Sequence, residues 1–104
     1  MAVSREVVEG VQIQGEDEKI AYSITTTPWG STPTTGSVVV KDASAAYAVV
    51  TTTVMPTGSL SILLDVITLP LLQSLTAGHT YRVEVKFTVG GNIEEAYFNV
   101  RAER

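Results

Sequence analysis

Apolar and polar residues alternate along several short stretches of this chain, and a period of two residues predicts β-strands. The clearest stretch runs from residue 80 to residue 89. Its apolar members, all on one predicted face, are Tyr81, Val83, Val85, Phe87 and Val89. Polar side chains fill the positions between them, so this strand is predicted to bury one face and expose the other.

A second strand is predicted to follow through a tight turn. Gly90, Gly91 and Asn92 form the turn, because glycine and asparagine tolerate the positive φ angles of two-residue hairpins. Residues 93–102 then alternate again, with Ala96 and Phe98 among the predicted inward positions. The two stretches therefore predict an antiparallel hairpin.

Five further strands are predicted, at residues 7–13 with Gly10 as a candidate bulge, 19–27, 37–42, 48–55 and 65–69, the last ended by Pro70. Turn residues separate them every eight to twelve positions, and no helical stripe interrupts the pattern. The chain is therefore predicted to be all-β: a seven-stranded antiparallel immunoglobulin-like (Greek-key) sandwich. Residues 1–104 are predicted to form a single domain of ordinary size.

The segment before residue 83 is similar to the tyrosine corner of Greek-key sandwiches. In that corner a tyrosine near the start of a strand returns its hydroxyl group to the backbone a few residues upstream. Leu75, Gly78 and Tyr81 supply the Leu-x-x-Gly-x-x-Tyr spacing, followed by alternating valines. The expected role of these three residues is structural.

A run of aliphatic residues stands where small polar turn residues are expected. It comprises Leu60, Ile62, Leu63 and Leu64, just before Asp65. Leaving such side chains in water is unfavourable by roughly 1.5–3 kcal/mol each relative to burial. Three interpretations stay open: an additional buried strand, a protein-contact patch, or an engineered interface on a natural scaffold.

The whole chain resembles small immunoglobulin-like structural proteins of tailed bacteriophages and prophages, and more broadly fibronectin III domains. The segments that carry the resemblance are Tyr22-Ser23-Ile24, Trp29-Gly30, Val38-Val39-Val40-Lys41-Asp42, Val66-Ile67-Thr68-Leu69-Pro70, the tyrosine corner and Glu95-Ala96-Tyr97-Phe98-Asn99-Val100. The resemblance implies a role in a virion or in its assembly, and it transfers no catalytic residue.

The charge distribution argues against several classes of partner. The net charge is −4 and the seven Lys and Arg residues are scattered, so neither nucleic acid nor an anionic membrane surface is an expected partner. No signal peptide or membrane-spanning segment is recognised, so a virion or the host cytoplasm is the expected location. Only 17% of the residues are charged, which is low for a soluble monomer and favours stable association with another protein.

No arrangement of residues predicts catalysis or a cofactor. His79 is the only histidine and is expected in a solvent-exposed loop, and the chain has no cysteine. Glu94 and Glu95 are adjacent on a strand, so their side chains point to opposite faces. The acidic run 16–18 is expected to be a solvated turn, with calcium binding as a minor alternative. The chain is therefore predicted not to be an enzyme and to have no cofactor.

The leading hypothesis is a structural interaction module that acts through the apolar residues 60–64. Its expected partner is a second copy of the chain, giving a homo-oligomer, or another structural protein. A designed variant that assembles or binds a target is one alternative. A carbohydrate-binding module using Trp29, Tyr47 and Tyr97 is another.

Overall fold

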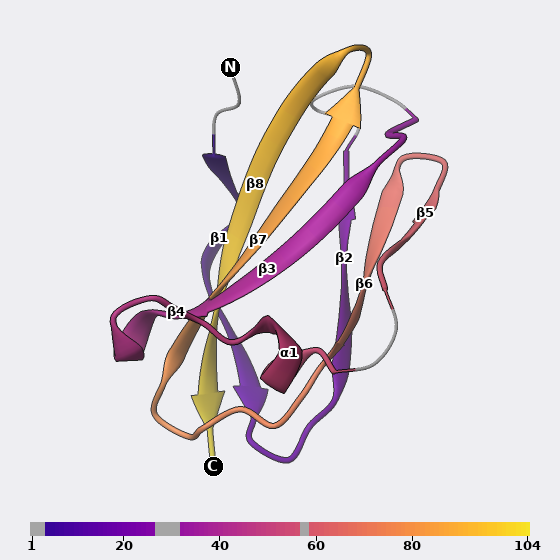
Figure 1. Ribbon diagram of the computed structural model, residues 1–104. Helices are drawn as coiled ribbons and strands as arrows, with labels where there is room; N and C mark the ends of the chain where they lie inside the picture. Colours follow the sequence, from indigo (N-terminus) through magenta and orange to yellow (C-terminus); the bar gives the residue numbers. More distant parts are fainter. Residues whose placement is uncertain (1–3, 27–31, 57–58) are drawn as a thin grey trace.

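The computed structural model describes residues 4–26, 32–56 and 59–104, with side chains placed from residue 11 onward. Strands dominate the described residues, and the two helical segments are only one turn long (Figure 1). The elements are β1 (Ser4–Gly15), β2 (Ile20–Thr25), β3 (Gly36–Asp42), the 3-10 helix η1 (Ala43–Ala45), β4 (Ala48–Val49), α1 (Thr51–Val54), β5 (Ser61–Leu63), β6 (Val66–Leu72), β7 (Thr80–Val89) and β8 (Asn92–Glu103). Neither described helix approaches the length needed to cross a membrane.

The strands form two sheets. The larger sheet has the order β1-β8-β7-β3-β4 and the smaller one the order β2-β6-β5. All neighbouring strands are antiparallel except β1 and β8, which run parallel. The described residues thus form an all-β structure, with eight strands instead of the seven predicted and one parallel pair in place of a wholly antiparallel arrangement.

The inward side chains of both sheets meet in one core, as their two-residue period requires. Its members are Ile24, Val40, Val54, Met55, Ile67, Leu69, Leu72, Leu75, Tyr81, Val83, Val85, Phe87, Val89, Ala96, Phe98, Val100 and Ala102. All five apolar residues that define the predicted strand 80–89 are among them. The hairpin of β7 and β8 is confirmed, and Gly90 and Gly91 form its turn with φ angles of 55° and 88°.

The predicted strand over residues 48–55 is wrong. Only Ala48 and Val49 are extended, and residues 51–54 form the helical turn α1. Contacts with β3 override the strand preference of the three threonines: the Thr51 hydroxyl group accepts a hydrogen bond from the Val40 amide at 2.9 Å. The helical turn then directs Val54 and Met55 into the core.

Pro70 does not end its strand as predicted. Strand β6 continues through this buried proline to Leu72. Its pairing with β2 shifts at this point, because Ala21 lies opposite Leu71 and Ser23 lies opposite Thr68. Two residues of β6 therefore face one of β2, and such a bulge accommodates a residue without a backbone donor.

Strand β1 buries a polar residue where its apolar residues predict a buried face. Val11 and Ile13 are about half exposed, whereas Gln14 is fully buried. The Gln14 amide nitrogen donates hydrogen bonds to the Leu72 carbonyl at 2.7 Å and to the Glu18 carbonyl at 3.0 Å. Its oxygen accepts one from the Tyr22 hydroxyl group at 2.9 Å. One side chain thereby links the two sheets. The pairing of β1 also shifts between residues 6 and 11, the interval that contains Gly10.

Candidate functional site

The apolar run 60–64 is divided between the core and the surface. Leu60 and Ile62 are half-buried and pack against the core. Leu63 and Leu64 are 75% and 76% exposed, the highest values among the large apolar side chains of the described residues. Pairing of Ile62 with the buried Ile67 explains the division, because residues opposite each other share one face of the sheet.

Leu64 occupies an unfavourable backbone conformation. Leu63 pairs with Val66, so Leu64 and Asp65 form the two-residue turn between β5 and β6. The φ angle of Leu64 is 54°, in the left-handed region where glycine, asparagine or aspartate normally stands in such turns. For an ordinary L-residue this region is unfavourable by roughly 1–2 kcal/mol. Folding by itself thus gives no reason for a leucine at this position.

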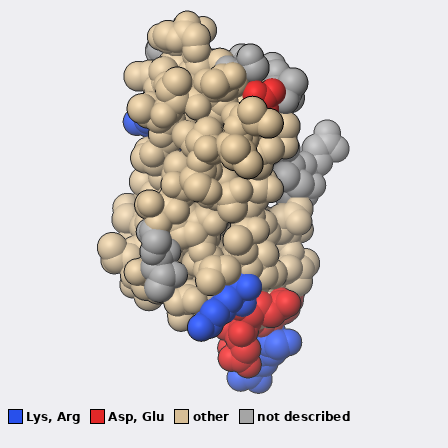
Figure 2. All heavy atoms as spheres, turned by 90° about the vertical axis from the view of Figure 1, so that its right-hand side faces the viewer, with Lys and Arg blue, Asp and Glu red and all other residues tan. Residues whose placement is uncertain are grey.

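The outer face of the smaller sheet carries no charged residue. The side chains that point outward from β2, β5 and β6, identified by their pairing, are Ala21, Ser23, Thr25, Ser61, Leu63, Val66, Thr68 and Leu71. Figure 2 views the side of the molecule on which β5 lies in Figure 1, and its central part is free of Lys, Arg, Asp and Glu. The water-facing side of an antiparallel sheet normally carries polar residues, charged ones among them. A face without any charged residue is therefore unusual.

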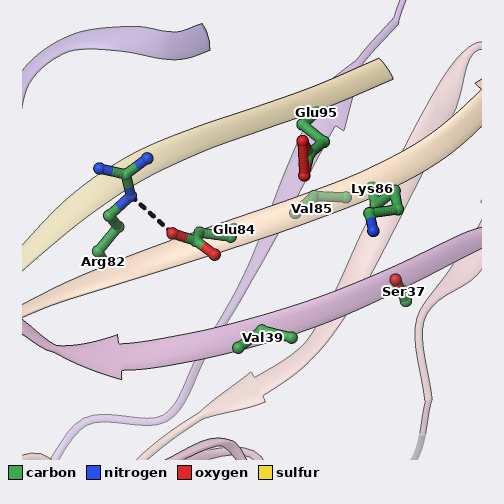
Figure 3. A pocket seen from close by; sticks show the side chains of 7 residues that line it. All are labelled: Ser37, Val39, Arg82, Glu84, Val85, Lys86 and Glu95. Carbon is green, nitrogen blue, oxygen red and sulfur yellow. Dashed lines mark ion pairs between the residues drawn. The ribbon is translucent and has the colours of Figure 1, made fainter. Parts of the chain in front are cut away.

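The outer face of the larger sheet is charged. Glu84 on β7 accepts ion pairs from Lys41 on β3 at 3.3 Å and from Arg82 at 2.9 Å. The Arg82 guanidinium group also lies over the ring of Tyr97, 3.8 Å from its centre. Figure 3 shows Arg82 and Glu84 beside a depression of about 240 Å³, which is also lined by Ser37, Val39, Val85, Lys86 and Glu95. Carboxylates and cations alternate there, which leaves the depression without a dominant charge.

The distribution of charge along the sequence carries a signal for the uncharged face. From Ile20 to Gly78 the chain has only three charged residues, which are Lys41, Asp42 and Asp65. The other fifteen lie in residues 1–19 and 79–104. Charge patterning by segment, and not only its total, therefore indicates which strands have an unusual exposed face.

The tyrosine-corner residues lie together at the start of β7. The Tyr81 hydroxyl group accepts a hydrogen bond from the Thr76 amide at 2.8 Å, five residues upstream. Leu75 is 5% exposed and belongs to the core, and Gly78 has a φ angle of 86°. A Cβ atom at Gly78 would meet nothing within 4 Å, so the backbone conformation, rather than space, requires glycine there.

His79 has a partner that its sequence neighbours do not suggest. Its Nδ1 atom lies 2.8 Å from Oδ2 of Asp42, which is buried at the end of β3. Oδ1 of Asp42 accepts from the Ser44 amide, and the Ser44 hydroxyl oxygen accepts from the Thr80 amide. His79 lies in a loop, as predicted, and its partly exposed side chain is held by a carboxylate. The three side chains tie η1 to the tyrosine corner.

The residues of the sugar-platform alternative are not brought together on the described surface. Trp29 lies outside the described residues. Tyr47 is 55% exposed in the turn between β3 and β4, whereas Tyr97 lies under Arg82 on the charged face. In the acidic turn, a Glu18 carboxylate oxygen accepts a hydrogen bond from the Gly15 amide at 2.6 Å. The described residues contain no group of three or more metal-binding side chains.

Comparison of the chain with protein families, with characterised proteins and with solved structures finds no match.

Proposed function

We propose that this chain is a non-enzymatic protein-contact module with an immunoglobulin-like sandwich fold. Its contact surface is strand β5, the leucine turn that follows it, and the uncharged outer face of the smaller sheet. The strand orders β2-β6-β5 and β8-β7-β3 support the fold, because immunoglobulin-like sandwiches order the corresponding strands in this way. The hydroxyl contact of Tyr81 supports it independently.

One observation carries the functional part of this proposal: a leucine pair that is unfavourable for the isolated molecule. Leu63 and Leu64 are about three-quarters exposed, and Leu64 also has a positive φ angle. Backbone strain kept at a surface position is typical of residues that serve a function. Exposed apolar side chains on an uncharged face are suited to contact another protein, because charged residues are depleted at the core of protein interfaces.

The sequence resemblance supports a setting for this contact. Small immunoglobulin-like proteins of tailed phages act in the virion or in its assembly, and the proposed role of this chain is of that kind. The placement in a phage particle depends on the resemblance alone.

Two leucine substitutions test whether the surface serves contact and not folding. Leu64→Gly is expected to raise the free energy of unfolding by about 0.5–1 kcal/mol, because glycine adopts the left-handed conformation without strain. Leu63→Glu is expected to change it by less than about 0.5 kcal/mol, as for other exposed positions. Both values are measured by urea denaturation.

A fluorescent apolar probe reports the surface itself. With about 1 µM protein, anilinonaphthalene sulfonate is expected to bind the native chain and to bind Leu63→Glu and Leu64→Gly much less. Val49→Glu is the matched control, because Val49 is 66% exposed on β4 of the other sheet. Native protein that binds no probe, or a Leu63→Glu variant that unfolds, would contradict the proposal.

A further inference from the structure

Strand β5 offers an open edge to a further strand. It is the last strand in the order β2-β6-β5, and no described strand pairs with its other side. In an antiparallel pair the backbone groups of alternate residues point to opposite edges, so unsatisfied donors and acceptors remain at this edge. Neither a proline nor a charged residue lies within Ser61–Leu63 to block pairing.

A cavity lies at the end of β5 opposite the leucine turn. Its volume is about 230 Å³, and its lining includes Val38, Met55, Ser59, Leu60 and Pro70. The two sheets approach closely here: a Cβ atom at Gly36 would come within 3.0 Å of the Leu60 side chain. Every lining residue is uncharged. The cavity is thus suited to an aliphatic side chain.

Leu64 and this cavity are at opposite ends of one short strand. Leu60 immediately precedes β5 and Leu64 immediately follows it. If two copies of β5 pair antiparallel around a two-fold axis at Ile62, Ser61 faces Leu63 of the other copy. Leu60 then faces Leu64 of the other copy. The turn leucine of each copy thereby reaches the cavity of the other, and the contact is made twice.

We infer that β5 pairs with β5 of a second copy of this chain, so that Leu64 of each copy enters the cavity beside Leu60 of the other. This inference rests on the proposed function and names its partner. It gives the strained turn a role, because the dimer buries a Leu64 side chain that is 76% exposed in the single chain. The resulting dimer has a closed two-fold interface and one continuous six-stranded sheet made from both smaller sheets.

The neutral surface around β5 lets a second copy approach despite the like net charges. Each chain has a net charge of −4, so two copies repel each other except where the facing surfaces are neutral. Asp65 is the only charged residue between Ser59 and Leu72, and one of its carboxylate oxygens accepts a hydrogen bond from the Thr32 amide. A two-fold interface brings a surface against itself, and the uncharged outward residues of β5 and β6 allow this without bringing like charges together.

The size of the contact sets its expected strength. Pairing over three residues buries less than the roughly 800 Å² per partner of a standard interface. The two leucine insertions add apolar burial without reaching that area, so the contact is expected to be weak, with a dissociation constant on the order of 10 µM.

Sedimentation velocity over a concentration series tests the dimer. The native chain is expected to change from monomer to dimer between about 1 and 100 µM, and Val49→Glu is expected to behave in the same way. Leu64→Glu introduces two carboxylates into apolar cavities and is expected to raise the dissociation constant about a hundredfold or more. Leu64→Gly, which favours the turn but removes the side chain, is expected to remain monomeric with an unchanged fold.

A charge pair tests the geometry of the insertion. Ser59 is exposed at the rim of the cavity, so Ser59→Lys alone is expected to weaken the dimer by placing a cation beside Leu64 of the other copy. The double variant Leu64→Glu with Ser59→Lys places opposite charges together twice and is expected to recover most of the association.

Three results would overturn the inference: a monomer at all concentrations, a dimer insensitive to Leu64→Glu, or a double variant no better than Leu64→Glu alone. Failure of this inference is separable from failure of the proposed function. A monomer that still binds the apolar probe through Leu63 and Leu64 retains the contact surface but excludes a second copy as its occupant. A monomer that binds no probe removes both proposals.

Discussion

The two outer faces of the sandwich expose different kinds of residue to water. The face of the larger sheet meets water with ion pairs around Glu84 and with a cation stacked on Tyr97. The face of the smaller sheet meets it with serine, threonine and aliphatic side chains. Both sheets contribute inward residues to the core, so folding does not require the difference. A face without charge loses little when water is removed from it, because few strongly hydrated groups must be desolvated.

The open edges of the sheets repeat this contrast. Strand β4 ends the larger sheet with two residues, and β5 ends the smaller one with three residues and a leucine turn. Short edge strands limit unwanted pairing, and both edges are short. Of these two edges, the one at β5 has an apolar turn at one end and an apolar cavity at the other. This difference is the reason that the proposed contact is placed at β5.

The largest expected effect comes from removing the side chain that joins the two sheets. Gln14→Ala leaves the Leu72 carbonyl and the Tyr22 hydroxyl group without their partner in a buried site. Urea denaturation is expected to show a loss of about 2–4 kcal/mol. Gln12→Ala is the control at the preceding inward position, which is only half-buried, and is expected to lose less than about 1 kcal/mol. Equal losses for the two variants would mean that Gln14 does not link the faces energetically.

A smaller effect is expected at the charged face. Glu84→Gln removes the carboxylate shared by Lys41 and Arg82, whose side chains are 34% and 28% exposed. At low salt the expected loss is about 0.5–1 kcal/mol, since partly exposed ion pairs are weak. High salt is expected to reduce this loss through screening. Thr68→Gln on the uncharged face is expected to show a salt-independent change. If both variants respond to salt alike, the electrostatic contrast between the faces has no consequence for stability.

The smallest effect is expected at alkaline pH, between the sheets. Burial, and then the nearby charge of Glu18, raise the pKa of Tyr22 above its ordinary value of 10.0. Above pH 10 the unfolded chain therefore loses this proton before the folded chain does. Stability from this group is complete below pH 10 and is lost as pH rises toward the folded pKa. The slope of unfolding free energy against pH is expected to be shallower in Tyr22→Phe than in the native chain above pH 10. Identical slopes would show that Tyr22 titrates as it does in water.

Periodicity by itself determined the strands that bury one face, and turn chemistry determined where they reverse. The residues 80–89 and the glycine turn after them needed no tertiary information, because local alternation and positive φ preferences already specify a half-buried hairpin. The spacing of Leu75, Gly78 and Tyr81 was likewise visible in the sequence. The charge-poor stretch 20–78 could have been noted, although it does not say which of its residues share a surface.

Tertiary contacts decided the rest. Residues 51–54 became helical because β3 supplies a donor for Thr51, and Gln14 became a core residue because strands far away in the sequence supply its partners. The leucine run was divided by the pairing of β5 with β6, which no local pattern specifies. A strand that buries one face shows alternating apolar and polar residues in its own sequence. The outer face of the smaller sheet is formed by three strands, so it exists only after those strands have paired. The same is true of the conformation of the turn between β5 and β6.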